Sequence, residues 1–416
     1  MKALCSSMGS FFYNRGGDVM NGVPETLLNE MIRHSNLKVQ RKGFAIADLL
    51  RDYWDAFVEA NAHLTIRDVV HQNVDRVRKC RTPELGYAMY ECPNCSNYHL
   101  AFHTCKSRFC NSCGVKYAKS RSEAVMRTLL DCRHRHITFT IPDSLRHYFR
   151  EDRSRLHLLF EAVNQTLRYL LLKQGKSKDY QAGFICVLHT FGRALTFNVH
   201  IHALISEGMI DSLGHFKPLK YFNFDLLRKA FMKCLLDLLH ASLGNRFYPE
   251  KCNLYAHQSK GFYVNAPDSS HRFKKQTELV KYVLRYTGRP VMAESRILDV
   301  DEVHDLITYF YEPHEDEHLP EEERSGPVKV VEHVFDFFKK LIIHIPDHQF
   351  KMIRYYGLYS AKGRRRLPAY RKRSTFLKSI RSLKWRALLR TTFHYDVLLC
   401  PCGAVMRYAR ESSYFP

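Results

Sequence analysis

Phe197-Asn-Val-His-Ile-His-Ala-Leu-Ile-Ser-Glu207 is the stretch that decides the fold, because it predicts a buried β-strand with polar chemistry on one face. Side chains alternate along a strand, so His200 and His202 share one face while Ile201 points to the other. Two imidazoles two residues apart on one face can hold a single metal ion. Strand histidines satisfied by hydrogen bonds are the alternative, and the pair alone leaves both readings open.

A pair of tyrosines follows in Lys281-Tyr-Val-Leu-Arg-Tyr-Thr287, a stretch with helical character. Tyr282 and Tyr286 are four residues apart and therefore share one helix face. For the tyrosines alone, a position in the core or on a surface helix face is the alternative. A two-histidine metal site together with a tyrosine pair is what metal-assisted attack of tyrosine on a DNA phosphodiester requires.

Both patterns also occur elsewhere, because the chain has 23 His and 24 Tyr. His134-Arg-His136 repeats the histidine spacing, and Tyr355 with Tyr359 repeats the tyrosine spacing. A charged residue separates the first pair, and Gly357 weakens the helix that the second pair needs. We therefore interpret both repeats as incidental.

The net charge of +22 at pH 7 indicates a polyanionic partner. Between Lys351 and Arg390 there are 14 Lys or Arg and no Asp or Glu, with Tyr370, Phe376 and Trp385 among them. Cations beside stacking surfaces are typical of nucleic-acid binding, and no apolar face accompanies them that would favour a bilayer. The predicted DNA contacts are Arg285, Arg289, Lys351, Arg354, Arg364, Arg365, Arg366, Arg371, Lys372 and Arg373; a solvated face is the alternative for the first two.

No run reaches the roughly 20 apolar residues of a membrane span. The first twelve residues also lack the apolar core of a signal peptide. We therefore expect a cytoplasmic protein that is associated with the nucleoid through DNA and has no membrane partner. Its 13 cysteines should be reduced.

Two Cys-x-x-Cys pairs predict a structural zinc site. Cys92-Pro-Asn-Cys95 and Cys110-Asn-Ser-Cys113 are separated by 14 residues, close to the spacing at which four thiolates surround zinc. Cys105 and Cys80 complicate this assignment, because either can replace a knuckle cysteine or belong to a second site. Cys400-Pro-Cys402 resembles half of a knuckle without a partner pair, and we do not expect it to bind zinc by itself.

The periodicity of the chain predicts an α+β fold with a mostly antiparallel sheet flanked by helices. A hairpin-like connection, Gly192–Leu195, places His189 on the strand before His200, where it can be a third metal ligand; packing beside Thr190 is the alternative. Strands are predicted at 136–141, 183–190, 197–207, 261–265, 291–299 and 305–311, and amphipathic helices at 153–173, 224–241 and 332–343.

Taken together, these residues resemble the two-tyrosine, HUH-type rolling-circle transposases of bacterial insertion sequences, which carry an N-terminal zinc-binding domain. HUH stands for histidine, hydrophobic, histidine. The resemblance covers roughly residues 75–403. It rests on Cys80-Arg-Thr with Leu85-Gly86, the two cysteine knuckles joined through Cys105-Lys-Ser-Arg-Phe-Cys110, His189-Thr-Phe-Gly192, His200-Ile-His202, Tyr282-Val-Leu-Arg-Tyr286, Glu294-Ser-Arg-Ile297, His344-Ile-Pro346 and Ile353-Arg-Tyr-Tyr-Gly357.

The resemblance implies a single-strand DNA endonuclease and strand transferase. His200 and His202, with a third polar ligand, would hold Mg²⁺ or Mn²⁺, and structural Zn²⁺ would bind the cysteines. Tyr282 and Tyr286 would be the nucleophiles that form 5′-phosphotyrosine bonds. The expected partners are the single-stranded or hairpin ends of a mobile element and its target DNA.

The resemblance also implies an order of domains. We expect a helical or irregular segment at 1–65, a zinc-binding and DNA-binding domain at 66–125, an HUH nuclease domain at 130–360 and a basic aromatic segment at 361–416. The chain departs from the family pattern at Leu85-Gly-Tyr-Ala88, at Arg108-Phe-Cys110 and at Cys400-Pro-Cys402. A non-catalytic zinc-dependent DNA-binding protein, and a related HUH replication initiator or relaxase, are the alternatives.

Overall fold

The computed structural model describes residues 44–95, 97–126, 128–175, 179–219, 221–265, 290–312, 326–366, 386–387, 390, 396 and 398–412. Its elements are helices and antiparallel strands, so the expected α+β class with antiparallel sheets is confirmed. The chain divides into two compact units, and each is treated by itself. The smaller comprises the described parts of Thr82–His103 and Val397–Pro416; the larger comprises those of Arg41–Arg81 and Thr104–Asp396.

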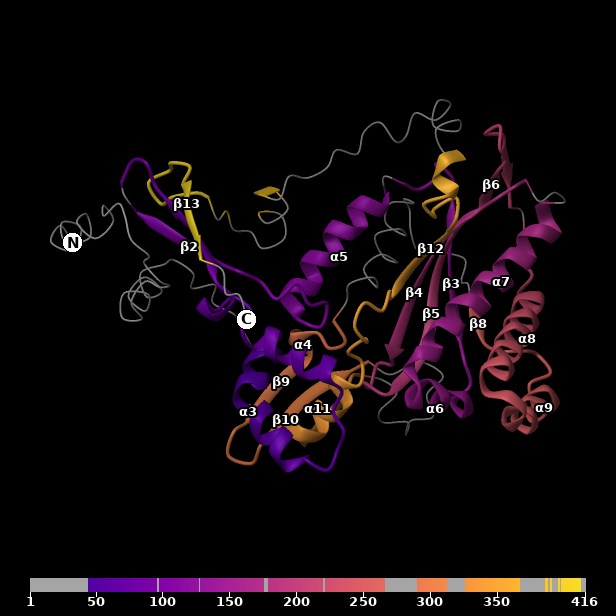
Figure 1. Ribbon diagram of the computed structural model, residues 1–416, viewed down its shortest axis with the longest axis horizontal. Coiled ribbons are helices and arrows are strands. Elements are labelled where there is room, and N and C mark those ends of the chain that lie inside the picture. The colour runs from indigo at the N-terminus through magenta and orange to yellow at the C-terminus, as the bar shows by residue number, and fades with distance from the viewer. Residues whose placement is uncertain are drawn as a thin grey trace. The chain divides into compact units, whose positions relative to one another are not determined.

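A five-stranded antiparallel sheet is the centre of the larger unit (Figure 1). The strands Gly183–Phe191 and Phe197–Ser206 form a hairpin that pairs His189 with His200. The neighbouring strand His134–Thr140 pairs Thr138 with His202. The strands predicted at 136–141, 183–190 and 197–207 are confirmed within a few residues. In spatial order the strands are β12 (Ile353–Gly357), β4 (Gly183–Phe191), β5 (Phe197–Ser206), β3 (His134–Thr140) and β8 (Val264–Asn265).

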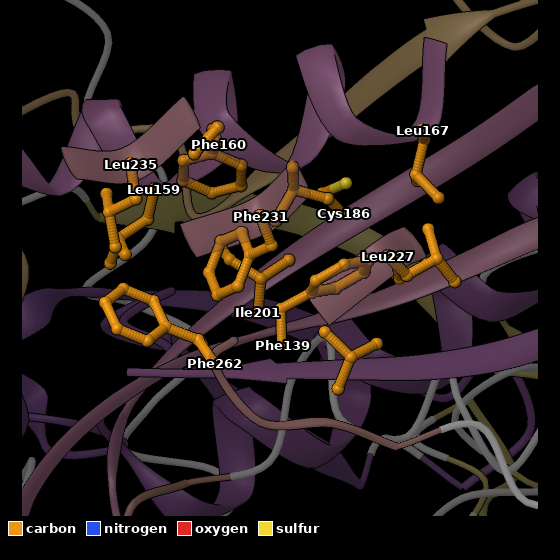
Figure 2. Packing of buried hydrophobic residues seen from close by; sticks show 14 of the residues in the cluster. Phe139, Leu159, Phe160, Leu167, Cys186, Ile201, Leu227, Phe231, Leu235 and Phe262 are labelled. Atoms are coloured by element: carbon orange, nitrogen blue, oxygen red, sulfur yellow. The ribbon is translucent and has the colours of Figure 1, made fainter. Parts of the chain in front are cut away.

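Two long helices, α7 (Leu156–Gly175) and α8 (Phe224–Leu243), pack against each other and cover one face of this sheet. Both helices follow the apolar period that predicted them. Figure 2 shows Ile201 and Phe139 of the strands packed beside Phe160 of α7 and Phe231 of α8, all fully buried. Burying each such side chain contributes about 1.5–3 kcal/mol, so this layer is the main core.

The opposite face of the sheet is divided between packing and chemistry. At one end Ile185 and Leu204 pack with Tyr359 and with residues near the end of α5 (Asn111–Met126). Tyr359 is fully buried, and a Cβ on Gly183 would lie 2.6 Å from its ring, so the start of β4 requires glycine. At the other end this face carries the histidines.

A second antiparallel sheet has three strands in the order β11 (Val328–His333), β10 (Leu306–Tyr311) and β9 (Ile297–Asp301). It packs with α11 (Val334–Ile342), whose Phe338 contacts Trp54 and Phe57 of α3. Helix α3 (Ile46–Ala60) packs in turn on α4 (Asp68–Arg78).

Two predicted boundaries are corrected in this region. The run at 291–299 begins with a 3-10 helix, Glu294–Arg296, before β9. The helix predicted at 332–343 begins only at Val334, because Glu332 and His333 pair with β10. The His333 imidazole also marks the boundary, since its Nδ1 accepts a hydrogen bond from Phe335 N at 3.1 Å as a helix cap.

The smaller unit is a three-stranded antiparallel sheet that joins distant parts of the chain. Tyr87, Met89 and Leu100 form its buried centre. None of its strands was predicted, because strands of five or six residues with mixed polarity carry little periodic signal. Their order is β13 (Arg407–Ser412), β1 (Tyr87–Glu91) and β2 (Tyr98–Phe102).

Shorter elements complete the larger unit. Leu145 and Phe149 of α6 and Leu254 of α9 join the main core. The elements are α6 (Asp143–Glu151), α9 (Tyr248–His257), the β6 (Gly208–Ile210) and β7 (Phe216–Pro218) pair, and 3-10 helices at Arg153–Arg155, Gly244–Phe247 and Gly363–Arg366. The smaller unit adds the 3-10 helix Pro83–Leu85.

Candidate functional site

Three histidines of the central sheet form the first candidate metal centre. His189, His200 and His202 place one ring nitrogen each within 4.8 Å of one another. The β4–β5 hairpin explains this convergence, because it pairs His189 with His200 while alternation adds His202 on the same face. The structure thus brings together the three histidines that the sequence indicates.

The surroundings of these imidazoles favour the neutral form. Burial lowers the pKa of His200 to about 4 and holds the pKa of His202 well below its ordinary value. Nδ1 of His200 donates to the backbone oxygen of Asn198 at 2.9 Å, which leaves Nε2 with a lone pair. A neutral imidazole with an oriented lone pair is the form that binds a metal ion.

The spacing of the donor atoms fits one divalent ion. Two nitrogens held at right angles about 2.1 Å from an octahedral ion lie about 3.0 Å apart. Nε2 of His200 and Nε2 of His202 are 3.1 Å apart. Asn198 lies on the same strand face as His200 and His202, because side chains alternate along the strand. Its Oδ1 adds an oxygen there, and this atom is buried and has no hydrogen-bond partner among the described residues.

His136 also belongs to this cluster, so our interpretation of the His134-Arg-His136 repeat as incidental is wrong for His136. Its Nε2 lies 2.9 Å from Nδ1 of His202, and the two rings stack with centroids 5.0 Å apart. Arg135 points to the other face, where it pairs with Glu207 at 2.7 Å. A charged residue between two strand histidines therefore does not exclude them from a metal site, because its side chain points to the opposite face of the sheet. His134 has a packing role, because its Nε2 and the hydroxyl of Tyr359 share a hydrogen bond.

A four-cysteine cluster in the larger unit forms the second candidate centre. Cys80, Cys105, Cys110 and Cys113 are all buried, with exposed fractions of 2–7%. Helix α5 begins directly after Cys110, so Cys110 precedes its first turn and Cys113 lies on that turn. Hydrogen bonds from Cys105 and Cys110 lower the pKa of the Cys80 thiol to about 7, which favours a thiolate.

A second four-cysteine cluster lies in the smaller unit and corrects the sequence-based pairing. Cys92 and Cys95 gather with Cys400 and Cys402, not with the knuckle at Cys110. The pairing of β13 with β1 explains the difference, because it brings the C-terminal cysteines beside the first knuckle. Our interpretation of Cys400-Pro-Cys402 as a half-knuckle without a partner pair is therefore wrong.

The sulfur spacings of both clusters fit tetrahedral zinc. Zinc–sulfur bonds of about 2.3 Å imply sulfurs about 3.8 Å apart. In the buried cluster the Sγ atoms of Cys80 and Cys110 are 3.8 Å apart, and Cys80 and Cys113 are 3.7 Å apart. In the other cluster Cys92 and Cys402 are separated by 3.5 Å. Four ligands close the coordination shell, so both sites are of the structural kind.

The predicted DNA-contacting residues differ in exposure, and several lie outside the described residues. Lys351, Arg364 and Arg365 are exposed. Arg354 instead lies over the ring of Phe160 at 4.3 Å, on the helix-covered face of the sheet. Arg366 ends the 3-10 helix Gly363–Arg366, while Arg285, Arg289, Arg371, Lys372 and Arg373 lie outside the described residues.

The predicted nucleophiles, Tyr282 and Tyr286, also lie outside the described residues. Tyr355 and Tyr359, the second tyrosine pair of the sequence, do not form a helix face: Tyr355 lies on β12 and Tyr359 follows it in the core. None of the helices among the described residues combines the length and apolarity that a membrane span needs.

Comparison with known proteins gives the family. One family model, described as "Putative transposase", matches residues 183–366, and another, described as "Transposase zinc-binding domain", matches residues 49–141. The transposase for insertion sequence element IS801 of Pseudomonas savastanoi pv. phaseolicola is 28% identical over 303 residues, which are 70% of each chain. "Putative transposase y4qJ" of Sinorhizobium fredii (strain NBRC 101917 / NGR234) is 24% identical over 342 residues, 78% of this chain and 82% of that protein. No solved structure matches the chain.

These matches fit the geometry described above. The histidine centre and most of the central sheet fall within the transposase match, and both Cys-x-x-Cys pairs fall within the zinc-binding match. The resemblance drawn from the sequence motifs is thereby confirmed. With a zinc-binding domain followed by a transposase domain, the chain belongs to the IS91 family of transposases and is homologous to the IS801 transposase.

Proposed function

We propose that the protein nicks and rejoins single-stranded DNA through 5′-phosphotyrosine intermediates during rolling-circle transposition. His189, His200 and His202 bind Mg²⁺ or Mn²⁺, and Tyr282 and Tyr286 are the nucleophiles. The observation that carries this proposal is the convergence of three imidazoles on one face of the sheet, with two Nε2 atoms 3.1 Å apart. The name of the IS801 relative, a transposase for an insertion sequence element, supports a mobile element as the substrate.

The chemistry requires an activated phosphate, because tyrosine is a weak nucleophile with an ordinary pKa of about 10. A divalent ion bound by the histidines would withdraw charge from the scissile phosphate and fix it for in-line attack. The tyrosine oxygen would then bond to phosphorus as the phosphorus–O3′ bond breaks. The phenol proton would pass to solvent, and the departing 3′ oxygen would take one proton from solvent to become a hydroxyl. The phosphotyrosine retains the ester energy, so the 3′-OH can reverse the step without a nucleotide cofactor.

The path of the chain supports the tyrosines as partners of the histidine centre. The segment that contains them follows β8 directly, and Asn265 of β8 pairs with Thr138 of β3. Thr138 in turn pairs with His202 of β5. Asn265, the last described residue before the tyrosines, therefore lies two strands away from a metal ligand.

Cationic and aromatic groups on the described surface support DNA as the partner. Arg121 of α5 lies 5.3 Å from the ring centre of Tyr355 and donates to its hydroxyl at 3.0 Å, and Arg364 lies 5.7 Å from the same ring centre. Tyr355 projects from the sheet face that also carries the histidines. Two guanidinium groups beside one ring can contact phosphates and stack on bases. We propose that the other predicted Lys and Arg residues, except Arg354, also contact the phosphate backbone of the DNA.

A cleavage assay tests this proposal. The full-length protein is incubated with single-stranded oligonucleotides that tile the DNA on both sides of its gene, with Mn²⁺ or Mg²⁺, and resolved on a denaturing protein gel. We expect a metal-dependent covalent adduct that mass spectrometry maps to Tyr282 or Tyr286. An adduct that persists in the Tyr282→Phe, Tyr286→Phe double variant would contradict the assignment of the nucleophiles.

The alternatives predict other results in the same assay. A non-catalytic zinc-dependent DNA-binding protein would bind these oligonucleotides without forming an adduct under either metal. A replication initiator or relaxase would form the adduct on plasmid origin sequences and not on the flanks of this gene. Adduct formation on the flanks alone supports the transposition reaction.

A further inference from the structure

The row of imidazoles His136, His202 and His200 can share its protons in two ways. In the first arrangement Nε2–H of His136 donates to Nδ1 of His202 at 2.9 Å, and Nε2–H of His202 donates to Nε2 of His200 at 3.1 Å. Nδ1–H of His200 ends the row by donating to the oxygen of Asn198 at 2.9 Å. Each imidazole is neutral, with one donor and one acceptor. In this arrangement Nε2 of His202 carries a proton, and the lone pair on Nε2 of His200 accepts it. The two Nε2 atoms therefore cannot both bind one metal ion.

Metal binding requires the second arrangement. For an ion to bind both rings, Nε2 of His202 needs a lone pair, so the proton of this ring must lie on Nδ1. The Nε2 proton of His136 passes to Nδ1 of His202, the Nε2 proton of His202 leaves to solvent, and solvent returns one proton to Nδ1 of His136. Both rings remain neutral. The hydrogen bond between His136 and His202 reverses its direction, and the hydrogen bond from His202 to His200 is lost.

We propose that His136 is a positioning residue that selects the metal-binding tautomer of His202; this inference rests on the proposed function of the histidine centre. His202 is buried, so its Nδ1–H needs an acceptor. Nε2 of His136, at 2.9 Å, lies nearer to this nitrogen than Oγ1 of Thr138, at 3.3 Å. The rings of His136 and His202 are inclined by 27°, with their centroids 5.0 Å apart. Acceptors behind metal-binding histidines commonly change metal affinity by about 10–100-fold.

A matched pair of variants tests this role in the full-length protein. In His136→Gln the amide oxygen takes the place of Nε2 and keeps an acceptor for His202. In His136→Met a side chain of similar length offers no comparable acceptor. We measure the Kd for Mn²⁺ by electron paramagnetic resonance of the free ion, and the thermal unfolding midpoint without metal as a folding control.

We expect His136→Met to raise the Kd for Mn²⁺ by about 10–100-fold, while His136→Gln stays within a few-fold of the parent protein. Equal Mn²⁺ affinity of the Met variant and the parent would overturn the proposal, and so would an equal loss in the Gln and Met variants. If His136→Met does not fold, His136→Asn replaces it, because the shorter amide cannot reach Nδ1 of His202 and should weaken Mn²⁺ binding in the same way.

A control separates this inference from the proposed function. His200→Ala should abolish the tight Mn²⁺ site. If Mn²⁺ binding survives in His200→Ala, the proposed metal centre itself is wrong. If His200→Ala loses the ion and His136→Met does not, the metal centre stands and only the role of His136 is refuted.

Discussion

The cysteine clusters and the histidine cluster differ in what they leave available. Each cysteine cluster offers four thiol ligands, which is the full number for zinc. The histidine cluster offers three imidazoles, with a buried amide oxygen of Asn198 on the same strand face. Three nitrogen ligands leave positions on an octahedral ion for substrate oxygens. Coordination that is complete stabilises the fold, whereas coordination that is incomplete permits chemistry.

The largest expected effect comes from breaking the buried cysteine cluster. Cys110→Ser should remove one zinc ion and unfold the start of α5, because structural zinc sites contribute about 10 kcal/mol or more of apparent binding free energy to folding. Native mass spectrometry should find one zinc ion per chain where the parent protein has two. The exposed Cys252, which belongs to neither cluster, gives the matched control Cys252→Ser. A Cys110→Ser protein with two zinc ions would show that the cluster is not a zinc site.

Breaking the histidine cluster should affect activity and leave the fold intact. His200→Ala should lower the rate of oligonucleotide nicking about a thousandfold, because loss of Lewis-acid stabilisation raises the barrier by several kcal/mol. The zinc content and the unfolding midpoint should match those of the parent protein. If His200→Ala nicks DNA within tenfold of the parent rate, the histidine cluster does not differ from the cysteine clusters in having a catalytic role.

The two cysteine clusters should also differ from each other. Cys95 and Cys402 are exposed, whereas every ligand of the Cys80–Cys113 cluster is buried. Cys402→Ser should therefore release one zinc ion and speed amide exchange in β13, while the main core keeps its unfolding midpoint. In the parent protein a colorimetric chelator should remove zinc in two phases, and the Cys402→Ser variant should lack the fast phase. A single phase in both proteins would contradict the difference in exposure.

The smallest expected effect is at Tyr359, on the packed end of the histidine face. Its hydroxyl accepts a hydrogen bond from Leu130 N at 3.2 Å and shares another with His134. Tyr359→Phe should lower the free energy of unfolding by about 1–3 kcal/mol, because buried polar groups lose a partner. Chemical denaturation measures this loss, and Mn²⁺ affinity should not change. A change in Mn²⁺ affinity would show that the two ends of this face are coupled.

The sequence predicted the regions where one periodic pattern is long enough to determine both element and face. The alternation in 197–207 gave β5 and the shared face of His200 and His202, and the helical period gave α7 and α8. The position of His189 followed from a short hairpin, which fixes register. Local patterns of this kind do not depend on distant parts of the chain.

Long-range pairing was not predictable in the same way. Four thiols bind zinc wherever they come from, so Cys92 and Cys95 carry no information about which other pair completes their site. That choice depends on the β1–β13 pairing, which a short strand near the C-terminus does not reveal. His136 was wrongly interpreted as incidental for a related reason, because only the register of β3 against β5 places it beside His202.

The cluster of Cys92, Cys95, Cys400 and Cys402 has a consequence for the order of events during synthesis. The buried cluster has all its ligands once residue 113 has left the ribosome, but the other cluster must wait for residue 402. At about 5–20 residues per second, the roughly 290 residues between them take about 15–60 s to translate. During that interval a nascent chain can carry one zinc ion and not two. Ribosome-bound chains and released chains should therefore differ by one zinc ion, so the metal content reports whether translation has reached the C-terminal cysteines.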